Sequence, residues 1–282
     1  GNDNCQPDGS GGCIPVYYRN QRSGSAPIAS LTWEPLTGLQ FYARYAEALR
    51  MPSLFEGTSG WSVSPVQNIE LKPEQARNKE IGLQYDRGTW RTSATYFRND
   101  YQNKIIGGTD VIYDINSGRR VTHWENAGKA LVEGVEGNFF VELTPSLDWN
   151  TNLTLMLNND NRDTGEPLSV IPKYTVNSTL DWRATDKLSF QVAGTYFGKQ
   201  KSPTYNYRTQ QDYDKTAQQD VDAYGLVDVS AGYKFNANYD VRVGVNNVFD
   251  KQILRGGNAS SSGANTYNQP GRAVFAALNI NF

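Results

Sequence analysis

The strongest constraint on the fold of this chain is a two-residue alternation of apolar and polar side chains, which recurs in many separate segments. The segment "YDVRVGVN" (239–246) places apolar side chains at its odd positions and polar or small ones at its even positions. The last ten residues, "AVFAALNINF", place Leu278, Ile280 and Phe282 on one face. Successive side chains of a strand point to opposite faces, so each segment predicts a strand with one apolar and one polar face.

Eleven segments carry this pattern, and β-branched and aromatic residues dominate them, as is typical of strands. Helical spacing of apolar residues is absent from the same windows. The predicted strands cover residues 26–33, 39–49, 76–86, 90–101, 125–143, 149–159, 173–183, 188–198, 223–235, 239–249 and 272–282.

The connections between these strands alternate between short and long. The short ones read "EPLTG", "DRGT", "TPSLD", "ATDK" and "NAN", and the long ones cover about 50–75, 102–124, 160–172, 199–222 and 250–271. Outer-membrane β-barrels separate their connections in this way, with short periplasmic turns and long extracellular loops. Their strands need only about 9–11 residues to cross the membrane. Their polar lumen accounts for a mean hydropathy as low as −0.61.

Aromatic residues lie near the short turns, as they do in the interfacial girdles of membrane barrels. The alternative is a soluble β-sandwich whose core these aromatic residues fill. The asymmetry of the loops and the position of the aromatic residues together favour an all-β, antiparallel transmembrane β-barrel. The aromatic residues concerned are Trp33, Tyr85, Trp90, Trp149, Trp182, Tyr233 and Phe235.

Composition and motifs argue against several classes of function. The net charge of −2 carries no basic excess, so nucleic acid is not expected as a partner. No run of about 18 apolar residues occurs, so no membrane-spanning helix is expected. The chain has one histidine and no nucleophile elbow, HExxH motif, P-loop or Cys/His cluster, so we expect neither an enzyme nor a metal site.

The only two cysteines, Cys5 and Cys13, lie close together in "CQPDGSGGC". Two cysteines around a glycine-rich spacer suit one local disulfide that closes a loop, which implies an oxidising compartment. Two free thiols or half of a metal site are the alternatives. We expect residues 1–25 to form an extracellular loop with this disulfide. Residues 26–282 are expected to form the C-terminal part of the transmembrane β-barrel.

The strand count carries a further implication, because single-chain bacterial barrels have even numbers of strands and eleven is odd. An open half-barrel would leave unpaired strand edges in lipid, which is costly. We therefore expect this chain to be the C-terminal part of a longer protein.

Several stretches resemble a known family. "YARYAEALRMPSLFE" followed by "NIELKPEQARNKEIGLQY" is similar to the signature hairpin of TonB-dependent outer-membrane receptors. "GVNNVFDKQI" and "ANTYNQPGRAVFAALNINF" resemble the C-terminus of these receptors. The stretches "YFRNDYQNKIIGG", "WENAGKALVEGVEGN", "GEPLSVIPKYTVNSTLDW" and "YFGKQKSP" resemble those of the catecholate-siderophore group, which includes ferric enterobactin receptors.

The resemblance implies a 22-stranded barrel of a Gram-negative outer membrane, of which this chain holds the last eleven strands. It also implies a plug domain, absent from this sequence, through which TonB, ExbB and ExbD drive uptake. The terminal pattern of Leu278, Ile280 and Phe282 resembles the signal read by the barrel assembly machinery. Lipid and lipopolysaccharide would surround the barrel. Family members also serve as phage and colicin receptors, although no residue here identifies such a partner.

The expected ligand is a ferric siderophore, and iron would enter only as part of it, so we expect no resident cofactor. A ferric tris-catecholate is a large anion with aromatic walls, which suits Arg and Lys for charge and Tyr and Trp for stacking. Solvated loop surface is the alternative role for any one of these residues. The candidates in the long loops are Trp61, Tyr113, Arg119, Arg120, Lys199, Lys201, Tyr205, Tyr207, Arg208 and Tyr213, with Tyr17, Tyr18, Arg19 and Arg22 in the first loop.

Two alternative functions remain open. Haem receptors of this superfamily carry a histidine between the two hairpin motifs, but this chain has "GTSGWSVSPVQ" there. His123 lies later and has no second histidine to join it in haem ligation, so a structural or surface role is expected. A general porin would share the strand pattern but not the family motifs.

In "KPEQARN", Glu74 and Arg77 are expected to make local polar contacts. Charges on the polar face, such as Asp228, Asp240 and Arg242, are expected to contact neighbouring strands and the plug.

Overall fold

The computed structural model of the chain describes part of its residues. The described residues are 5–7, 13–15, 22–53, 56, 71–107, 112–114, 119–121, 124–168, 171–203, 218–253 and 270–280. Among them, no helix is long and apolar enough to cross a membrane.

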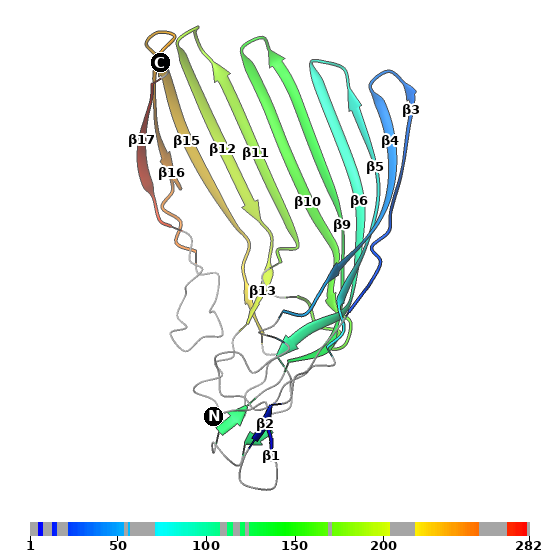
Figure 1. Cartoon of the computed structure of the whole chain (residues 1–282). Coiled ribbons are helices and arrows are strands. Elements are labelled where there is room, and N and C mark those ends of the chain that lie inside the picture. Colours follow the sequence, from blue (N-terminus) through cyan, green and yellow to red (C-terminus); the bar gives the residue numbers. More distant parts are fainter. Residues whose placement is uncertain are drawn as a thin grey trace. The chain divides into compact units, whose positions relative to one another are not determined.

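The main element is one eleven-stranded sheet, in which each strand lies beside its neighbours in chain order (Figure 1). All eleven predicted strands are present, and most of their bounds lie within three residues of the prediction. The strands are β3 (Ile28–Leu36), β4 (Leu39–Arg50), β5 (Glu74–Asp86), β6 (Trp90–Gly107), β9 (Trp124–Thr144), β10 (Leu147–Asn161), β11 (Tyr174–Arg183), β12 (Leu188–Phe197), β15 (Tyr224–Lys234), β16 (Tyr239–Asn246) and β17 (Ala273–Ile280).

The chain divides into two compact units. The first comprises Gly1–Ala29, Tyr45–Asn78 and Asn99–Leu131, and the second comprises Ser30–Arg44, Lys79–Arg98 and Val132–Phe282. The second unit contains all five short turns, which lie together at one end of the sheet (Figure 1). The first unit contains the parts of β4, β5, β6 and β9 from which the long connections 51–73 and 108–123 leave.

Three small hairpins lie in regions that were predicted as loops. They are β1 (Cys5–Pro7) with β2 (Cys13–Pro15), β7 (Ile112–Asp114) with β8 (Arg119–Val121), and β13 (Gln200–Pro203) with β14 (Gln218–Val221). Each strand has only three or four residues, so its sequence is too short to display an alternating pattern.

The apolar faces of neighbouring strands are in register within the second unit. Across six strands from β10 to β17, one row of paired positions holds only apolar residues, and Val192 and Val274 in this row are 46% and 79% exposed. A continuous exposed apolar face of this kind suits an apolar surrounding such as lipid. The row consists of Trp149, Leu180, Val192, Val229, Val245 and Val274.

Aromatic rings pack in pairs beside the short turns, as the girdle prediction requires. Trp182 stacks on Phe190 at 5.5 Å between ring centroids, and Trp33 stacks on Phe41 at 5.7 Å. Tyr233 meets Phe235 edge-on at 5.0 Å. Their rings remain partly exposed, since Trp33 is 63% and Trp182 48% exposed.

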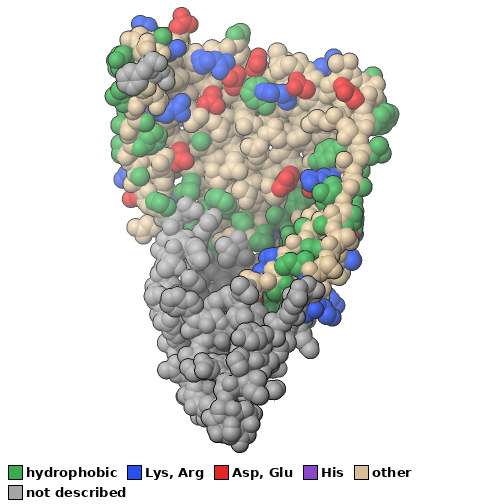
Figure 2. All heavy atoms as spheres, viewed as in Figure 1, with side chains coloured by type: hydrophobic (Ala, Val, Ile, Leu, Met, Phe, Trp, Pro, Cys, Tyr) green, Lys and Arg blue, Asp and Glu red, His purple; other side chains and the backbone are tan. Residues whose placement is uncertain are grey.

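The polar face is joined by side-chain hydrogen bonds between neighbouring strands. Asn138 of β9 donates to Asn150 at 3.1 Å and to Asn152 at 2.5 Å, both in β10. Gln191 of β12 donates to Asp181 of β11 at 2.7 Å. These bonds give the polar side chains hydrogen-bond partners within the protein. In Figure 2, charged side chains of both signs gather towards the short-turn end of the face in view.

One residue breaks the alternation of β17. Phe275 lies on the polar face, where it pairs with Gly244 of β16. A Cβ atom added at Gly244 would lie 2.6 Å from Phe275 ring carbons and 2.7 Å from the carbonyl oxygen of Val229. The ring therefore covers the glycine, and only glycine fits beneath it.

Candidate functional site

Long connections leave the sheet at the end opposite the short turns, and most of the predicted ligand-binding residues lie in them. The described residues there are mainly those at the bases of the loops. These bases decide how each loop is held, so the site is described from them upward.

The base of the connection 51–73 is built around Arg50, the last residue of β4. Its two terminal nitrogens each lie 2.9 Å from a carboxylate oxygen of Glu56, and its Nε lies 2.6 Å from Glu74 of β5. The other oxygen of Glu74 accepts a hydrogen bond from the backbone N–H of Ile105 at 2.7 Å. A planar guanidinium that bridges two carboxylates is a strong, directional link, so Arg50 joins this loop to β5 and β6.

Glu56 is held in its ionised form by this cluster. Its side chain is 12% exposed, and it also accepts hydrogen bonds from the backbone N–H and the hydroxyl of Ser53, at 2.8 and 2.9 Å. The Arg50 guanidinium, helped by Ser53, lowers the pKa of Glu56 to about 2 despite its partial burial.

The other end of the same connection is held by Asn126 of β9. Its Oδ1 accepts from the backbone N–H of Lys72 at 2.6 Å, and its Nδ2 donates to the carbonyls of Lys72 at 2.9 Å and Asn103 at 2.8 Å. The side-chain amide thus both accepts from and donates to backbone groups, as the backbone of a neighbouring strand does. These hydrogen bonds fix the residues just before β5.

A second asparagine closes the connection between β16 and β17. Asn247 is only 4% exposed, and its Nδ2 donates to the carbonyls of Lys251 at 3.0 Å and Pro270 at 3.1 Å. Its Oδ1 accepts from the N–H of Lys251 at 2.9 Å. Nearby, Asp250 accepts from the N–H of Arg272 at 2.8 Å. The two ends of the connection are therefore tied together at their base.

The predicted ligand-binding lysines at the base of the connection 198–223 have carboxylate partners. The ammonium of Lys201 lies 2.8 Å from Asp220, and that of Lys199 lies 3.3 Å from Asp222. Lys201 lowers the pKa of Asp220 by this contact. Both lysines keep exposed surface, so they remain candidates, but part of their charge is neutralised within the chain.

The other predicted residues are placed only in part. Tyr113 pairs across the small β7–β8 hairpin with Arg120, and Asp114 pairs with Arg119, whereas their side chains lie outside the described residues. Cys5 and Cys13 lie in the paired strands of the β1–β2 hairpin, and the disulfide between them stays a prediction. Trp61, Tyr205, Tyr207, Arg208, Tyr213, His123 and Phe282 lie outside the described residues.

The expected local contacts of the "KPEQARN" stretch are present. Besides the Arg50–Glu74 link, the Nε of Arg77 lies 3.7 Å from Glu47 of β4. Asp228 accepts from the N–H of Asn247 at 2.7 Å, as expected for a charge of the polar face that contacts a neighbouring strand. Within the described part of the chain, no group of three or more His, Cys, Asp or Glu residues could hold a metal ion.

Few sequence signals indicate which residues hold the loops. Arg50 and Glu56 lie in the family-like stretch "YARYAEALRMPSLFE", but nothing in their spacing indicates that they bind one another. The pair "NN" at the end of β16 is a turn signal, and Asn247 there adopts a φ of 50°, which asparagine tolerates better than most residues. Asn126 has no comparable local signal.

Comparison with known proteins places these features in a family context. The β-barrel model of TonB-dependent receptor-like proteins matches residues 6–248. The chain is 41% identical over 276 residues to the ferric enterobactin receptor PirA of Pseudomonas aeruginosa, a match that covers 89% of this chain and 37% of PirA. It is 39% identical over 227 residues to the ferrienterobactin receptor of Escherichia coli, covering 76% of this chain and 30% of that receptor.

A comparison with solved structures also finds similarity to a ferric enterobactin receptor. A variant of the ferric enterobactin receptor PfeA from Pseudomonas aeruginosa matches with a TM-score of 0.77 at 33% identity, covering 91% of this chain and 40% of that one. The chain thus spans less than half the length of these relatives.

Proposed function

Because this chain belongs to the TonB-dependent receptor family, as part of its β-barrel, we propose that the whole protein takes up a ferric siderophore of the catecholate class. The observation that supports the substrate class is the 41% identity to a ferric enterobactin receptor over 89% of this chain. Of the candidates, the connection 51–73 carries Trp61, and the connection 198–223, which has Lys199 and Lys201 at its base, carries Tyr205, Tyr207, Arg208 and Tyr213.

Family membership confirms the coarser predictions. The eleven strands are part of a receptor barrel, and the chain is a part of an outer-membrane receptor rather than an enzyme. The further proposal is that these strands form half of a 22-stranded barrel and pair at β3 and β17 with strands outside this sequence.

The proposed binding step takes place on the extracellular loops. The candidate basic residues would attract the anionic siderophore, and the tyrosines would stack on its catechol rings. Lys199 and Lys201 would take part by sharing their charge between Asp222 or Asp220 and the ligand. Release into the lumen would need the plug and its coupling to TonB, ExbB and ExbD, which lie outside this sequence.

Uptake of radioactive iron tests the proposal. The full receptor would be expressed in a bacterial strain that lacks its own catecholate receptors. Uptake of ⁵⁵Fe–enterobactin would be measured in this strain and in a derivative of it that lacks TonB. We expect uptake that depends on TonB and that falls at least about tenfold when residues 204–217 are deleted. Equal uptake of ferric catecholate with and without the receptor would contradict the proposed function.

A further inference from the structure

The strands β12 and β15 continue beyond the main sheet as a separate two-stranded sheet, β13 with β14 (Figure 1). Both strands are interrupted at the same level, at residues 198–199 and 222–223. The pairing register is the same on either side of this break, because Phe197 pairs with Tyr224 and Gln200 with Val221. Within the part of the chain that the structure describes, β13 and β14 pair as strands only with each other.

The end of the main sheet next to this break is firmly held. The backbone N–H of Gly198 donates to the carbonyl of Tyr174 in β11 at 2.7 Å. Phe197 and Tyr224 pack against each other with their ring centroids 4.9 Å apart, and Tyr224 is buried. Beyond the break, the β13–β14 pair consists of only four pairs of residues. A short strand pair on a packed base can open locally while the base stays folded, so the break has the properties of a hinge.

Two exposed ion pairs hold the two strands together on one face. The ammonium of Lys201 lies 2.8 Å from Asp220, and at the hinge that of Lys199 lies 3.3 Å from Asp222. The side chains of Asp220 and Asp222 are 69% and 88% exposed, so water and dissolved anions reach both pairs. Exposed ion pairs contribute little to stability, and an anion of higher charge can therefore compete with the two carboxylates for the lysines.

The opposite face of the strand pair is buried and carries an unpartnered amide. Gln200 and Val221 are paired one position along from the ion pairs, which places them on this face, and they are 5% and 7% exposed. Both Oε1 and Nε2 of Gln200 are buried without a hydrogen-bond partner in the described structure. In water both atoms would be hydrogen bonded, so this burial favours any arrangement in which Gln200 is exposed.

We propose that the β13–β14 pair is a clasp that an anionic ligand releases. The Lys201–Asp220 and Lys199–Asp222 ion pairs close the clasp, and it opens about the break at 198–199 and 222–223 when the ligand binds the two lysines. Opening gives the amide of Gln200 hydrogen bonds, which offsets part of the loss of the ion pairs. The identity of the anion as a ferric catecholate rests on the proposed function, whereas the clasp itself rests on these contacts.

The reaction rate of a thiol placed on the buried face measures the opening of the clasp. The full receptor would carry Val221→Cys, a change of similar size at a buried position, and its reaction with a water-soluble maleimide would be followed on the purified protein. The receptor without this substitution gives the background from Cys5 and Cys13. We expect slow labelling without ligand and labelling about fivefold faster with saturating ferric enterobactin, because both ion pairs are then lost.

Two variants of the Val221→Cys receptor test the clasp without any ligand. Lys199→Ala/Lys201→Ala should be labelled about fivefold faster, because it lacks both ion pairs. Gln200→Leu should be labelled about threefold more slowly, because the closed clasp then buries an apolar side chain of similar size in place of an unpartnered amide. If the amide of Gln200 instead stabilised the closed arrangement, its loss would make labelling faster.

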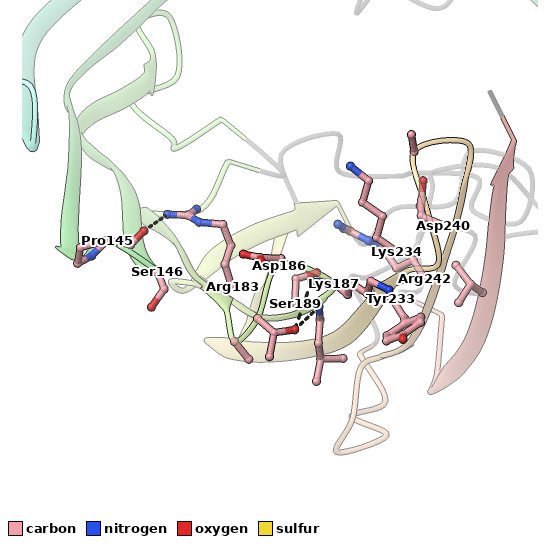
Figure 3. Close-up of a pocket in the computed structure, with 16 residues that line it drawn as sticks. Pro145, Ser146, Arg183, Asp186, Lys187, Ser189, Tyr233, Lys234, Asp240 and Arg242 are labelled. Carbon is pink, nitrogen blue, oxygen red and sulfur yellow. Dashed lines mark hydrogen bonds between the residues drawn. The ribbon is translucent and has the colours of Figure 1, made fainter. Parts of the chain in front are cut away.

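Lys187→Ala/Lys234→Ala is the matched control, because it removes the same charge at the short-turn end, where both lysines line a concave region of about 820 Å³ (Figure 3). Its labelling rate should be unchanged, and heat-modifiable mobility on gels would confirm that each barrel is folded. An unchanged rate in Lys199→Ala/Lys201→Ala, or faster labelling of Gln200→Leu, would overturn the clasp.

The ligand arm separates this inference from the proposed function. Ferric enterobactin that binds, as measured by quenching of tryptophan fluorescence, without accelerating the labelling would overturn release by the ligand. Ferric enterobactin that does not bind would contradict the proposed function instead, and the ligand-free variants would still decide whether the clasp exists.

Discussion

At the scale of single residues, the loops of this receptor part depend on a few side chains that bind backbone or charge at the loop bases. Arg50 joins Glu56 and Glu74, and Asn126 and Asn247 each pair with backbone groups of two other positions. Such contacts decide whether a long loop has one arrangement or many, because closing a loop costs conformational entropy.

Replacing Arg50 tests the first of these contacts. Arg50→Ala removes the link between two carboxylates, and we expect local opening of the connection 51–73 to become easier by about 1 kcal/mol, or about fivefold. Limited proteolysis of the folded receptor would measure this as faster cleavage in that connection. Arg50→Lys keeps the charge but loses the planar guanidinium, so its cleavage rate should fall between those of the native receptor and Arg50→Ala. An unchanged cleavage rate in Arg50→Ala would show that the cluster does not hold the loop.

The same cluster gives a pH dependence. The pKa of Glu56 is about 2 in the folded chain, against an ordinary value of 4.5. A lowered pKa means that the stabilisation is fully present above the ordinary value and is lost as the pH falls towards the folded value. We expect cleavage of this connection by pepsin, corrected for enzyme activity, to be constant above about pH 4.5 and to rise below it. The Glu56→Gln variant should be cleaved faster at every pH and should not show this rise. A pH profile like that of the native receptor would contradict the role of ionised Glu56 in holding the connection.

At the scale of elements, the connection between β16 and β17 depends on Asn247. Asn247→Gly keeps the φ of 50° but loses three hydrogen bonds, so it isolates the contribution of the side chain. We expect it to destabilise the region by about 1–3 kcal/mol, because buried backbone groups lose their partners. Asn247→Ala should cost more, since alanine also resists a positive φ. Urea unfolding would measure both, and equal stability of Asn247→Gly and the native receptor would count against this role.

The contact between Phe275 and Gly244 predicts a steric limit in the sheet. Gly244→Ala would place a methyl group 2.6 Å from the ring and 2.7 Å from a backbone oxygen, and we expect a loss of about 1–3 kcal/mol from overpacking. Gly194→Ala in β12 is the matched control, because its nearest neighbour would lie 3.9 Å away. Thermal unfolding of the two variants should therefore differ, and identical melting temperatures would contradict the packing described for β17.

Elements differ in how far sequence predicts them. The eleven long strands follow from a period of two that continues for eight or more residues, and the short turns follow from their Asn, Asp, Gly and Pro residues. The small hairpins could not be predicted, because strands of three or four residues carry no periodic signal. The Arg50 cluster could not be predicted either, since Arg50 and Glu74 are 24 residues apart and meet only when β4 and β5 pair.

At the scale of the whole molecule, this chain is part of a TonB-dependent receptor barrel in which short turns alternate with long connections. Most of the candidate siderophore residues belong to the long connections of the sequence. If the siderophore binds on these connections, as proposed, charge reversal near the short turns, as in Lys234→Glu/Arg242→Glu, should leave siderophore affinity unchanged. A loss of siderophore affinity in this variant, with the barrel still folded by heat-modifiable mobility on gels, would contradict a binding site on the long connections.

We propose that the receptor containing this chain recognises a ferric catecholate. The most direct measurement is a titration of the purified full receptor with ferric enterobactin, a ferric hydroxamate and haemin, followed by quenching of tryptophan fluorescence. We expect saturable quenching by ferric enterobactin, with binding at least a hundredfold tighter than that of the other two ligands. Preferential binding of haemin or the hydroxamate would contradict the substrate class and leave only the barrel and its family in place.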